Sequence, residues 1–422
     1  MPYNRISVIG LGYIGLPTAA VFASRKMKVI GVDVNSEVVE TINKGEIHIV
    51  EPELDMVVRA TVTEGYLHAT TTPEPADAFL IAVPTPFTGD HQPDLKYIEA
   101  AAKAIAPVLK KGDLVVLEST SPVGATEQMA AWMAQIRKDL SFPQSAGEKS
   151  DIRVAHCPER VLPGHVIREL VENDRVIGGM TSKCSKAAHD LYKIIVAGEC
   201  VITDTRTAEM AKLTENSFRD VNIAFANELS IICDKLGINV WELIRLANRH
   251  PRVNILQPGP GVGGHCIAVD PWFIISKTPE ESRLIRTARE VNDSKPQWVL
   301  DKVQSALGEF LSDNATKTAK DVIIACFGLA FKPDIDDLRE SPAFAISQRI
   351  AASHPGQTLI VEPNIEQLPA GKLDGCMLVE ANQALKNADI IVMLVDHNPF
   401  KDIDPRRLER RHLVDSRGIW TV

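Results

Sequence analysis

The sequence lacks a long hydrophobic run, a positive net charge and closely spaced cysteines. Its most apolar stretches, 78–84 and 390–395, have the length of a strand, whereas a membrane-spanning helix needs roughly 20 apolar residues. We therefore expect no membrane insertion. Lys and Arg number 46 against 55 Asp and Glu, a formal net charge of -9, so no global positive field favours nucleic acid or anionic lipid. Any anionic ligand must be bound by a local group of basic side chains.

Cysteine is scarce and widely spaced. The seven cysteines stand at positions 157, 184, 200, 233, 266, 326 and 376, and the closest two are 16 residues apart. The paired spacing of zinc and redox sites is therefore missing, which favours a reducing compartment, the cytoplasm. Aromatics are only 5%, but 45% hydrophobic and 24% charged residues are ordinary for a globular protein. The 422 residues are enough for two or three domains.

The pattern of apolar residues predicts an α/β protein. Short β-rich runs at 5–9, 28–32, 78–83, 114–118 and 152–155 alternate with amphipathic stretches, as in parallel βαβ units. Segment 205–236 contains neither Gly nor Pro and predicts one helix of about 45 Å, which is long enough to bridge domains or subunits. A shorter helix is expected at 240–248, and another from about 280, which Pro296 should interrupt or kink.

Further β-type runs at 322–327, 358–361, 389–395 and 412–414 indicate a second α/β domain. The predicted fold class is therefore two Rossmann-like doubly wound domains, 1–204 and 312–422. A helical central domain, 205–311, is expected to join them.

A glycine motif between the first strand and the first helix predicts a dinucleotide site. GLGYIG at 10–15 matches GxGxxG, and a second strand ends at Asp33, 23 residues after Gly10. A carboxylate there would accept hydrogen bonds from a ribose and repel a 2'-phosphate, so NAD is favoured over NADP. The alternative is a tight turn without a ligand. The predicted cofactor residues in this motif are Gly10, Gly12, Tyr13, Ile14, Gly15 and Asp33.

Three threonines follow two later strands of the same predicted sheet. Thr85 lies in VPTP, and Thr120 and Thr126 lie in ESTSPVGAT. In doubly wound sheets ligands bind outside the carboxyl ends of the strands. We expect these side chains to point toward the cofactor or the reacting carbon, although any one of them alone is more often a turn residue.

A polar helix face and a glycine-rich loop supply the candidate catalytic groups. Lys212, Asn216 and Arg219 share one face of the long helix by their spacing, which a merely solvated face would explain equally well. The loop 258–264 holds four glycines in six positions and no charge, which indicates a backbone lying close against something. It leads to Cys266, with Asp270 four residues further on.

A cysteine is more often a small buried hydrophobe than a nucleophile, but this loop should expose Cys266. His265 next to it would suit a metal, yet the sequence has no second Cys/His cluster at ligand spacing, so we expect none. A thiol working with NAD indicates a specific chemistry. Oxidation of an alcohol to an aldehyde needs only hydride transfer and a base, whereas oxidation onward to an acid needs a covalent hold on the aldehyde.

Seven motifs resemble the nucleotide-sugar 6-dehydrogenases, from one end of the chain to the other. They are GLGYIGLPT (10–18), VPTP (83–86), ESTSPVGAT (118–126), CPERVLPG (157–164), EMAKLTENSFRDVNIAFANELS (209–230), GPGVGGHCIAVDPWF (259–273) and LAFKPDIDDLRESP (329–342). Within them, CPERVLPG and NRHPRVNILQPGPGVGGHC look most like the branch that acts on UDP-N-acetyl-D-mannosamine. The resemblance implies an NAD-binding domain, a helical middle that forms a homodimer, and a C-terminal domain that holds UDP.

The resemblance also implies roles for individual residues. Cys266 becomes the nucleophile, Lys212 steadies the oxyanion and moves a proton, and Asn216 and Asp270 support water and hydroxyl positions. Glu159 matches the glutamate near the hydrolytic water. The implied substrate contacts are Arg160, Val161, Lys212, Asn216, Arg219, His250, Arg252, Gly263, Phe331, Lys332 and Arg339, and Arg417 matches a basic position assigned to NAD.

The implied substrate is a UDP-N-acetylhexosamine, oxidised at carbon 6 for surface polysaccharide synthesis. Pro163 stands where UDP-glucose dehydrogenases place a second acidic residue, which disfavours UDP-glucose but leaves it and UDP-N-acetylglucosamine as alternatives. A diphosphate needs local bases such as Arg252, Lys332 and Arg339, although Arg339 with its acidic neighbours would also suit a surface ion-pair patch. Two further hypotheses stay open, a two-electron alcohol dehydrogenase and a nucleotide-sugar sensor without catalysis.

Overall fold

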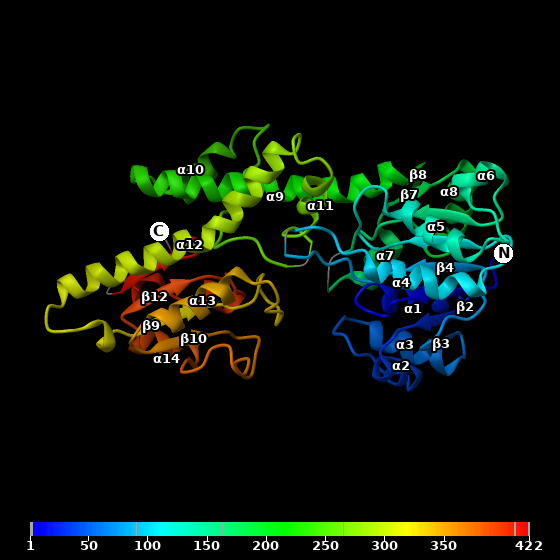
Figure 1. The fold of residues 1–422 in the computed structure, drawn as a ribbon. Coiled ribbons are helices and arrows are strands. Elements are labelled where there is room, and N and C mark those ends of the chain that lie inside the picture. Colours follow the sequence, from blue (N-terminus) through cyan, green and yellow to red (C-terminus); the bar gives the residue numbers. More distant parts are fainter. Residues whose placement is uncertain (1–2, 90, 162–163, 265, 409–410, 421–422) are drawn as a thin grey trace. The chain divides into compact units, whose positions relative to one another are not determined.

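The protein is described by a computed structural model that covers residues 3–89, 91–161, 164–264, 266–408 and 411–420. The chain forms two compact units (Figure 1). Unit 1 is Met1–Glu215 with Trp272–Pro279, and unit 2 is Asn216–Pro271 with Glu280–Val422. None of the helices in these described ranges is long and apolar enough to cross a membrane.

Unit 1 is built on an eight-stranded sheet in the order β3-β2-β1-β4-β5-β6-β7-β8. All pairings are parallel except that of β6 with β7. The first six strands have the Rossmann order, whose switch point lies between β1 and β4. The strands are β1 (Arg5–Ile9), β2 (Lys28–Val32), β3 (Leu67–Thr70), β4 (Ala78–Ile81), β5 (Leu114–Leu117), β6 (Arg153–His156), β7 (Arg175–Gly179) and β8 (Cys200–Asp204).

Both faces of this sheet are covered by helices. Along β4, Ala78 and Leu80 belong to one apolar cluster with α1, α3, α7 and α8, whereas Phe79 and Ile81 belong to a second with α4 and α5. This alternation is what a buried parallel sheet requires. The helices are α1 (Gly15–Ser24), α2 (Ser36–Asn43), α3 (Leu54–Thr63), α4 (Lys96–Ile105), α5 (Ala125–Ile136), α6 (Pro143–Ala146), α7 (Val166–Glu172) and α8 (Ser182–Tyr192), with 3-10 turns η1 (Ala106–Val108) and η2 (Gly147–Lys149).

Unit 2 contains a second, five-stranded parallel sheet in the order β11-β10-β9-β12-β13. It repeats the first five positions of the sheet in unit 1, so the prediction of two Rossmann-like sheets is confirmed. The α12–α13 side and the α14–α15 side each bury one apolar cluster against it. The strands are β9 (Ile324–Phe327), β10 (Thr358–Val361), β11 (Met377–Leu378), β12 (Ile390–Met393) and β13 (His412–Asp415).

The helices of unit 2 are α10 (Val240–Ala247), α12 (Arg283–Asp313), α13 (Pro342–Ser353), α14 (Ala381–Asn387) and α15 (Asn398–Lys401), with 3-10 turns η3 (Ala319–Asp321) and η4 (Pro405–Arg407). Helix α12 runs through Pro296 without interruption, so of the two predicted outcomes the interruption is wrong and the kink stays a prediction. Proline removes one backbone hydrogen bond, but the neighbouring Asn292, Lys295 and Val299 are buried and keep α12 in place.

Helix α9 (Thr205–Leu236) has the predicted bounds and 32 residues. It begins in unit 1 and continues into unit 2, whereas α11 (Asp270–Lys277) begins in unit 2 and continues into unit 1. The segment predicted as a central domain, 205–311, therefore contributes residues to both units. Its boundaries stay a prediction.

Candidate active site

The glycine motif of unit 1 forms a tight turn between β1 and α1. Gly10 has a φ of +89°, and a Cβ there would lie 2.6 Å from the carbonyl oxygen of Ala82. A Cβ on Gly15 would lie 1.7 Å from the carbonyl oxygen of Gly10, whereas one on Gly12 would meet nothing within 4 Å. Two glycines thus close the turn, and the third leaves room for a ligand. Tyr13 is 43% exposed, and Ile14 is the N-cap residue of α1.

Asp33 follows β2 and faces this turn. Its Oδ2 accepts a hydrogen bond of 2.9 Å from the N–H of Leu11, and its Oδ1 accepts one of 2.9 Å from the N–H of Asn35. The carboxylate therefore stands at the end of β2 beside the glycine turn, as a ribose acceptor must. These residues fit NAD, because the open space at Gly12 and the first amides of α1 suit a pyrophosphate.

The loops after β4 and β5 are neighbours, because the Ser119 hydroxyl donates to the carbonyl oxygen of Val83 at 2.7 Å. In the first loop, the Thr85 hydroxyl oxygen is buried and has no hydrogen-bond partner among the described residues. In the second, Thr120 is half-buried. A polar ligand would satisfy the Thr85 hydroxyl, since buried polar groups are normally paired.

Thr126 is fully buried, and its hydroxyl donates to Oε1 of Glu209 at 2.6 Å. The Glu209 carboxylate also accepts the N–H groups of Gly124 and Thr126, at 2.7 and 2.8 Å. Glu209 thus fixes the start of α5 from α9. Sequence reasoning missed it, although it precedes Lys212 by three residues and so shares that face of the helix.

Glu159 is buried and forms an ion pair with Arg175, also buried. Glu118 lies nearby and accepts a hydrogen bond of 2.6 Å from the Tyr192 hydroxyl. Burial, and then the charge of Glu159, raise the pKa of Glu118 to about 8. A small cavity of about 10 Å³, roughly the room that one water needs, is lined by Glu159, Arg175 and their neighbours. Arg175 was missed because only the fold brings β7 to this site.

Arg160 and Val161 line the same cavity. The Arg160 guanidinium forms an ion pair of 2.7 Å with Glu215 of α9. Lys212, one turn earlier on α9, is half-buried. The ion pair of Arg160 with Glu215 therefore places the CPER segment beside α9, about one turn from Lys212, within unit 1.

Cys266 is the exposed cysteine of the seven, all of which lie in the described ranges. Burial raises the pKa of other thiols, and the pKa of Cys157 reaches about 12. The Cys266 carbonyl oxygen accepts the N–H of Asp270 at 2.9 Å, at the start of α11. The Asn216 amide donates to Oδ2 of Asp270 at 2.5 Å, and both side chains are buried. Unit 2 thus brings together three of the predicted catalytic residues.

The glycine-rich loop lies against the second sheet's connections, as its composition predicts. A Cβ on Gly263 would lie 2.4 Å from the carbonyl oxygen of Glu340 and 2.7 Å from Cδ of Pro342. A Cβ on Gly264 would lie 3.1 Å from the ring of Phe331. The loop therefore packs directly on the segment that carries Phe331 and Lys332.

The predicted basic residues differ in how far they are already paired. Arg339 forms an ion pair of 2.7 Å with Asp337, and Arg417 one of 2.6 Å with Asp396. The Lys332 ammonium lies 5.9 Å from the centre of the Phe331 ring. The remaining predicted positions of unit 2, on α9 and after α10, are exposed: Arg219, His250 and Arg252.

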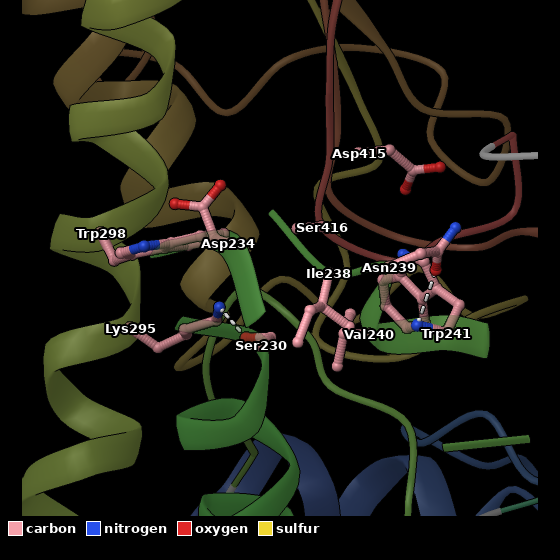
Figure 2. Close-up of a pocket in the computed structure, with 10 residues that line it drawn as sticks. All are labelled: Ser230, Asp234, Ile238, Asn239, Val240, Trp241, Lys295, Trp298, Asp415 and Ser416. Atoms are coloured by element: carbon pink, nitrogen blue, oxygen red, sulfur yellow. Dashed lines mark hydrogen bonds between the residues drawn. The ribbon is translucent and has the colours of Figure 1, made fainter. Parts of the chain in front are cut away.

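A cavity of about 230 Å³ in unit 2 contains none of the predicted residues (Figure 2). It is lined by Trp241, Trp298, Asp234 and the buried Lys295, whose ammonium donates to the Ser230 hydroxyl. Burial lowers the pKa of Lys295 to about 7. Lys295 therefore loses its proton far more readily than an exposed lysine.

In the described ranges no group of three or more His, Cys, Asp and Glu is placed to hold a metal ion. Pro163 and His265 lie outside the described residues.

The sequence matches three profiles of the UDP-glucose/GDP-mannose dehydrogenase family. They are the NAD binding domain at residues 4–196, the central domain at 206–294 and the UDP binding domain at 325–422. The chain is 68% identical over 420 residues to a UDP-N-acetyl-D-mannosamine dehydrogenase of Yersinia pestis, covering 100% of both. It is 67% identical over 420 residues to an NDP-N-acetyl-D-galactosaminuronic acid dehydrogenase of Ralstonia solanacearum, covering 100% of this chain and 97% of the relative.

The fold is similar to the solved structure of UDP-D-ManNAc dehydrogenase from Pyrococcus horikoshii. The TM-score is 0.85 at 40% sequence identity, with 98% of this chain and 96% of the other covered.

Proposed function

The chain belongs to the UDP-glucose/GDP-mannose dehydrogenase family, and on that premise we propose that it oxidises carbon 6 of UDP-N-acetyl-D-mannosamine to the carboxylate, giving UDP-N-acetyl-D-mannosaminuronate. The reaction removes four electrons in two steps. The carrying observation is the exposure of Cys266 in a chain whose other cysteines are buried or half-buried in the described structure.

Cys266 supplies the covalent hold that the second oxidation needs. Its thiolate sulfur adds to the aldehyde carbon and forms a thiohemiacetal, and loss of two further electrons leaves a thioester that water hydrolyses. NAD would accept one hydride in each oxidation, so two NAD molecules are reduced for each uronate formed. The amides of α1, together with Asp33, would bind and orient the cofactor.

The remaining residues hold protons and water. Lys212 is assigned to the oxyanion on the reacting carbon and to proton transfer. Asn216 and Asp270 are already hydrogen-bonded to each other, so they can orient a water molecule or a sugar hydroxyl as a unit. Glu159 is assigned to the hydrolytic water, and its ion pair with the buried Arg175 holds the carboxylate in place.

The sugar is tested with a panel, because relatives of nearly equal identity carry names with different sugars. The purified chain is incubated with NAD and UDP-N-acetylmannosamine, UDP-N-acetylgalactosamine, UDP-N-acetylglucosamine or UDP-glucose. We expect the mannosamine derivative to give the highest kcat/KM and two NADH for each uronate formed. One NADH with a free carbonyl product would instead support a two-electron dehydrogenase, and binding without NADH a sensor.

The same proposal includes a cytoplasmic place in the synthesis of a surface polysaccharide of the enterobacterial common antigen type. It also includes a homodimer. On α9, Phe218, Phe225 and Ile232 recur every seven residues and are 69%, 52% and 45% exposed, an apolar stripe that a second copy would cover. Light scattering on the purified chain should give twice the monomer mass, and replacing Phe225 with Asp should reduce it to that of a monomer.

A further inference from the structure

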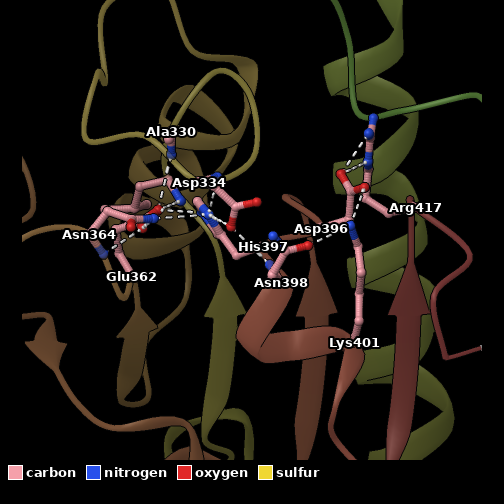
Figure 3. A network of polar contacts seen from close by, with 10 residues as sticks. Ala330, Asp334, Glu362, Asn364, Asp396, His397, Asn398, Lys401 and Arg417 are labelled. Carbon is pink, nitrogen blue, oxygen red and sulfur yellow. Dashed lines mark hydrogen bonds and ion pairs between the residues drawn. The ribbon is translucent and has the colours of Figure 1, made fainter. Parts of the chain in front are cut away.

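We propose that a buried pair, Glu362 and His397, positions the segment 329–334 and thereby sets the affinity for the UDP group. This rests on the proposed function, since Phe331 and Lys332 of that segment are assigned to the nucleotide sugar. Figure 3 shows the buried pair with Ala330 and Asp334 of the segment. Neither Glu362 nor His397 would touch the substrate, so we treat both as positioning residues.

Glu362 holds the start of the segment. It follows β10 and is 4% exposed. Its Oε2 accepts the N–H of Leu329 at 2.7 Å and that of Ala330 at 3.1 Å. Although burial opposes ionisation, the hydrogen bonds from His397 and these amides lower the pKa of Glu362. The carboxylate is therefore charged, which strengthens its bonds to the backbone.

His397 holds the end of the segment. It is fully buried, and its Nε2 lies 3.0 Å from Oε2 of Glu362. The N–H of Asp334 donates to Nδ1 of His397 at 2.9 Å. An N–H donor needs a lone pair, so Nδ1 carries no proton and the proton on Nε2 is donated to Glu362. One buried pair thus anchors the backbone on both sides of Phe331 and Lys332.

The backbone at Asp334 shows that this anchoring works against a local preference. Asp334 has a φ of +61°. This conformation is energetically unfavourable for any residue other than glycine, and it persists only where its surroundings impose it. Besides the bond to His397, Oδ1 of Asp334 accepts the N–H of Asn398 at 2.9 Å. Without these bonds we expect the segment to relax toward other conformations.

The anchored segment reaches two further parts of the candidate site. The Phe331 ring lies under Gly264 of the glycine-rich loop, two residues before Cys266. On the other side, Asp396 directly precedes His397 and pairs with Arg417. A shift of His397 would therefore disturb Arg417 as well as Lys332, and both are cations suited to a diphosphate.

Two near-isosteric variants separate the two bonds of His397. In His397→Gln the amide nitrogen takes the place of Nε2, which keeps the bond to Glu362 and removes the acceptor for Asp334. In His397→Asn the amide oxygen takes the place of Nδ1, which keeps the bond to Asp334 and removes the one to Glu362. His354→Gln is the matched control. His354 is a buried histidine of the same unit, and its Nε2 is hydrogen-bonded to the carbonyl oxygen of Val322. Val322 precedes β9, whereas the segment 329–334 follows it.

The full chain is titrated with UDP by calorimetry and assayed with the UDP-sugar and NAD. For His397→Gln we expect the UDP Kd and the KM for the sugar nucleotide to rise about tenfold, as for one lost hydrogen bond. The kcat should stay within about twofold, and the KM for NAD should rise less than the KM for the sugar nucleotide, because Arg417 is the one predicted NAD residue that unit 2 contributes. His397→Asn should lose less affinity, and His354→Gln should change the Tm but not the UDP Kd.

The inference is overturned if His397→Gln binds UDP as tightly as the wild type. It is also overturned if the loss of UDP affinity in all three variants is proportional to the decrease in their Tm. If His397→Gln does not fold, Asn364→Ala replaces it, since this exposed amide contacts both Glu362 and His397. An unchanged UDP Kd there would also overturn the inference. If the wild type neither binds UDP nor oxidises any UDP-sugar, the proposed function itself is wrong, and the inference that rests on it is wrong too.

Discussion

The substitution Gly263→Ala adds a single methyl group where the glycine-rich loop packs against Glu340 and Pro342 of unit 2. The Cβ would lie 2.4 Å from the carbonyl oxygen of Glu340 and 2.7 Å from Cδ of Pro342, whereas ordinary contact begins at 3.4 Å. Both obstacles belong to backbone or to a ring, so neither can rotate away. The loop must therefore move by about 1 Å, and Cys266 follows three residues later.

We expect a large loss of rate with a smaller loss of stability. A displacement of about 1 Å at a reacting group costs roughly 100-fold in rate, and overpacking costs about 1–3 kcal/mol of folding free energy. The Gly263→Ala chain should therefore show a kcat about 100-fold lower, with a Tm lower by a few degrees. The readouts are NADH formation at saturating substrate and thermal unfolding followed by circular dichroism.

Gly308→Ala is the control in the same unit. Gly308 lies inside α12, and a Cβ there would meet nothing within 4 Å. Alanine should stabilise that helix by about 0.5–1 kcal/mol and leave the rate unchanged. A Gly263→Ala enzyme with wild-type kcat and Tm would refute the close packing from which the effect is derived.

Three further perturbations test the site and the helices that support it. Cys266→Ser should abolish uronate formation and Lys212→Ala should slow both oxidations, as followed by product chromatography; normal uronate yield from the serine variant would exclude the covalent mechanism. Lys295→Met should increase the free energy of unfolding at pH 7 by on the order of a few kcal/mol, and so raise the Tm. The buried lysine has a pKa of about 7, so the unfolded chain binds more protons than the folded one up to about pH 10. That gain should shrink as the pH approaches 10, and a gain independent of pH would contradict the assignment. Arg289→Met should destabilise the chain by about 3–5 kcal/mol in urea unfolding, since it leaves the fully buried Asp220, 2.6 Å away, without its counter-charge. Adding Asp220→Asn should recover part of this loss. If the free-energy changes of the two single variants simply add in the double variant, the two side chains do not interact as a buried pair.

The sequence was most informative where a local rule acts alone. The bounds of α9 could be predicted because no Gly or Pro interrupts 205–236 and Gly237 follows. The strands with continuous apolar runs were also found, with ends shifted by a few residues. Strand β8, in contrast, has the sequence CVITD, which mixes apolar and polar residues, and most of its residues are exposed. It is the edge strand of the sheet and pairs with β7 alone, and no periodicity distinguishes such a strand from a loop.

Tertiary contacts explain what the sequence could not supply. Motifs predict that Thr126 and Glu159 matter, but not that Glu209 binds the first or that Arg175 binds the second. Their partners come from elements 83 and 16 residues away. Likewise, nothing in the spacing shows that Glu362 and His397 meet, since each lies after a different strand of the second sheet. Only strand order brings them together.

The division of α9 and α11 between the units has a practical consequence for engineering. The chain passes from one unit to the other three times, after Glu215, after Pro271 and after Pro279, so a single protease cut at any one junction leaves two covalent tethers. The first crossing lies inside a continuous helix, where one inserted residue turns everything downstream by about 100°. Chimeras that exchange whole halves between relatives must therefore preserve the helical phase at this point and keep the other two crossings in register.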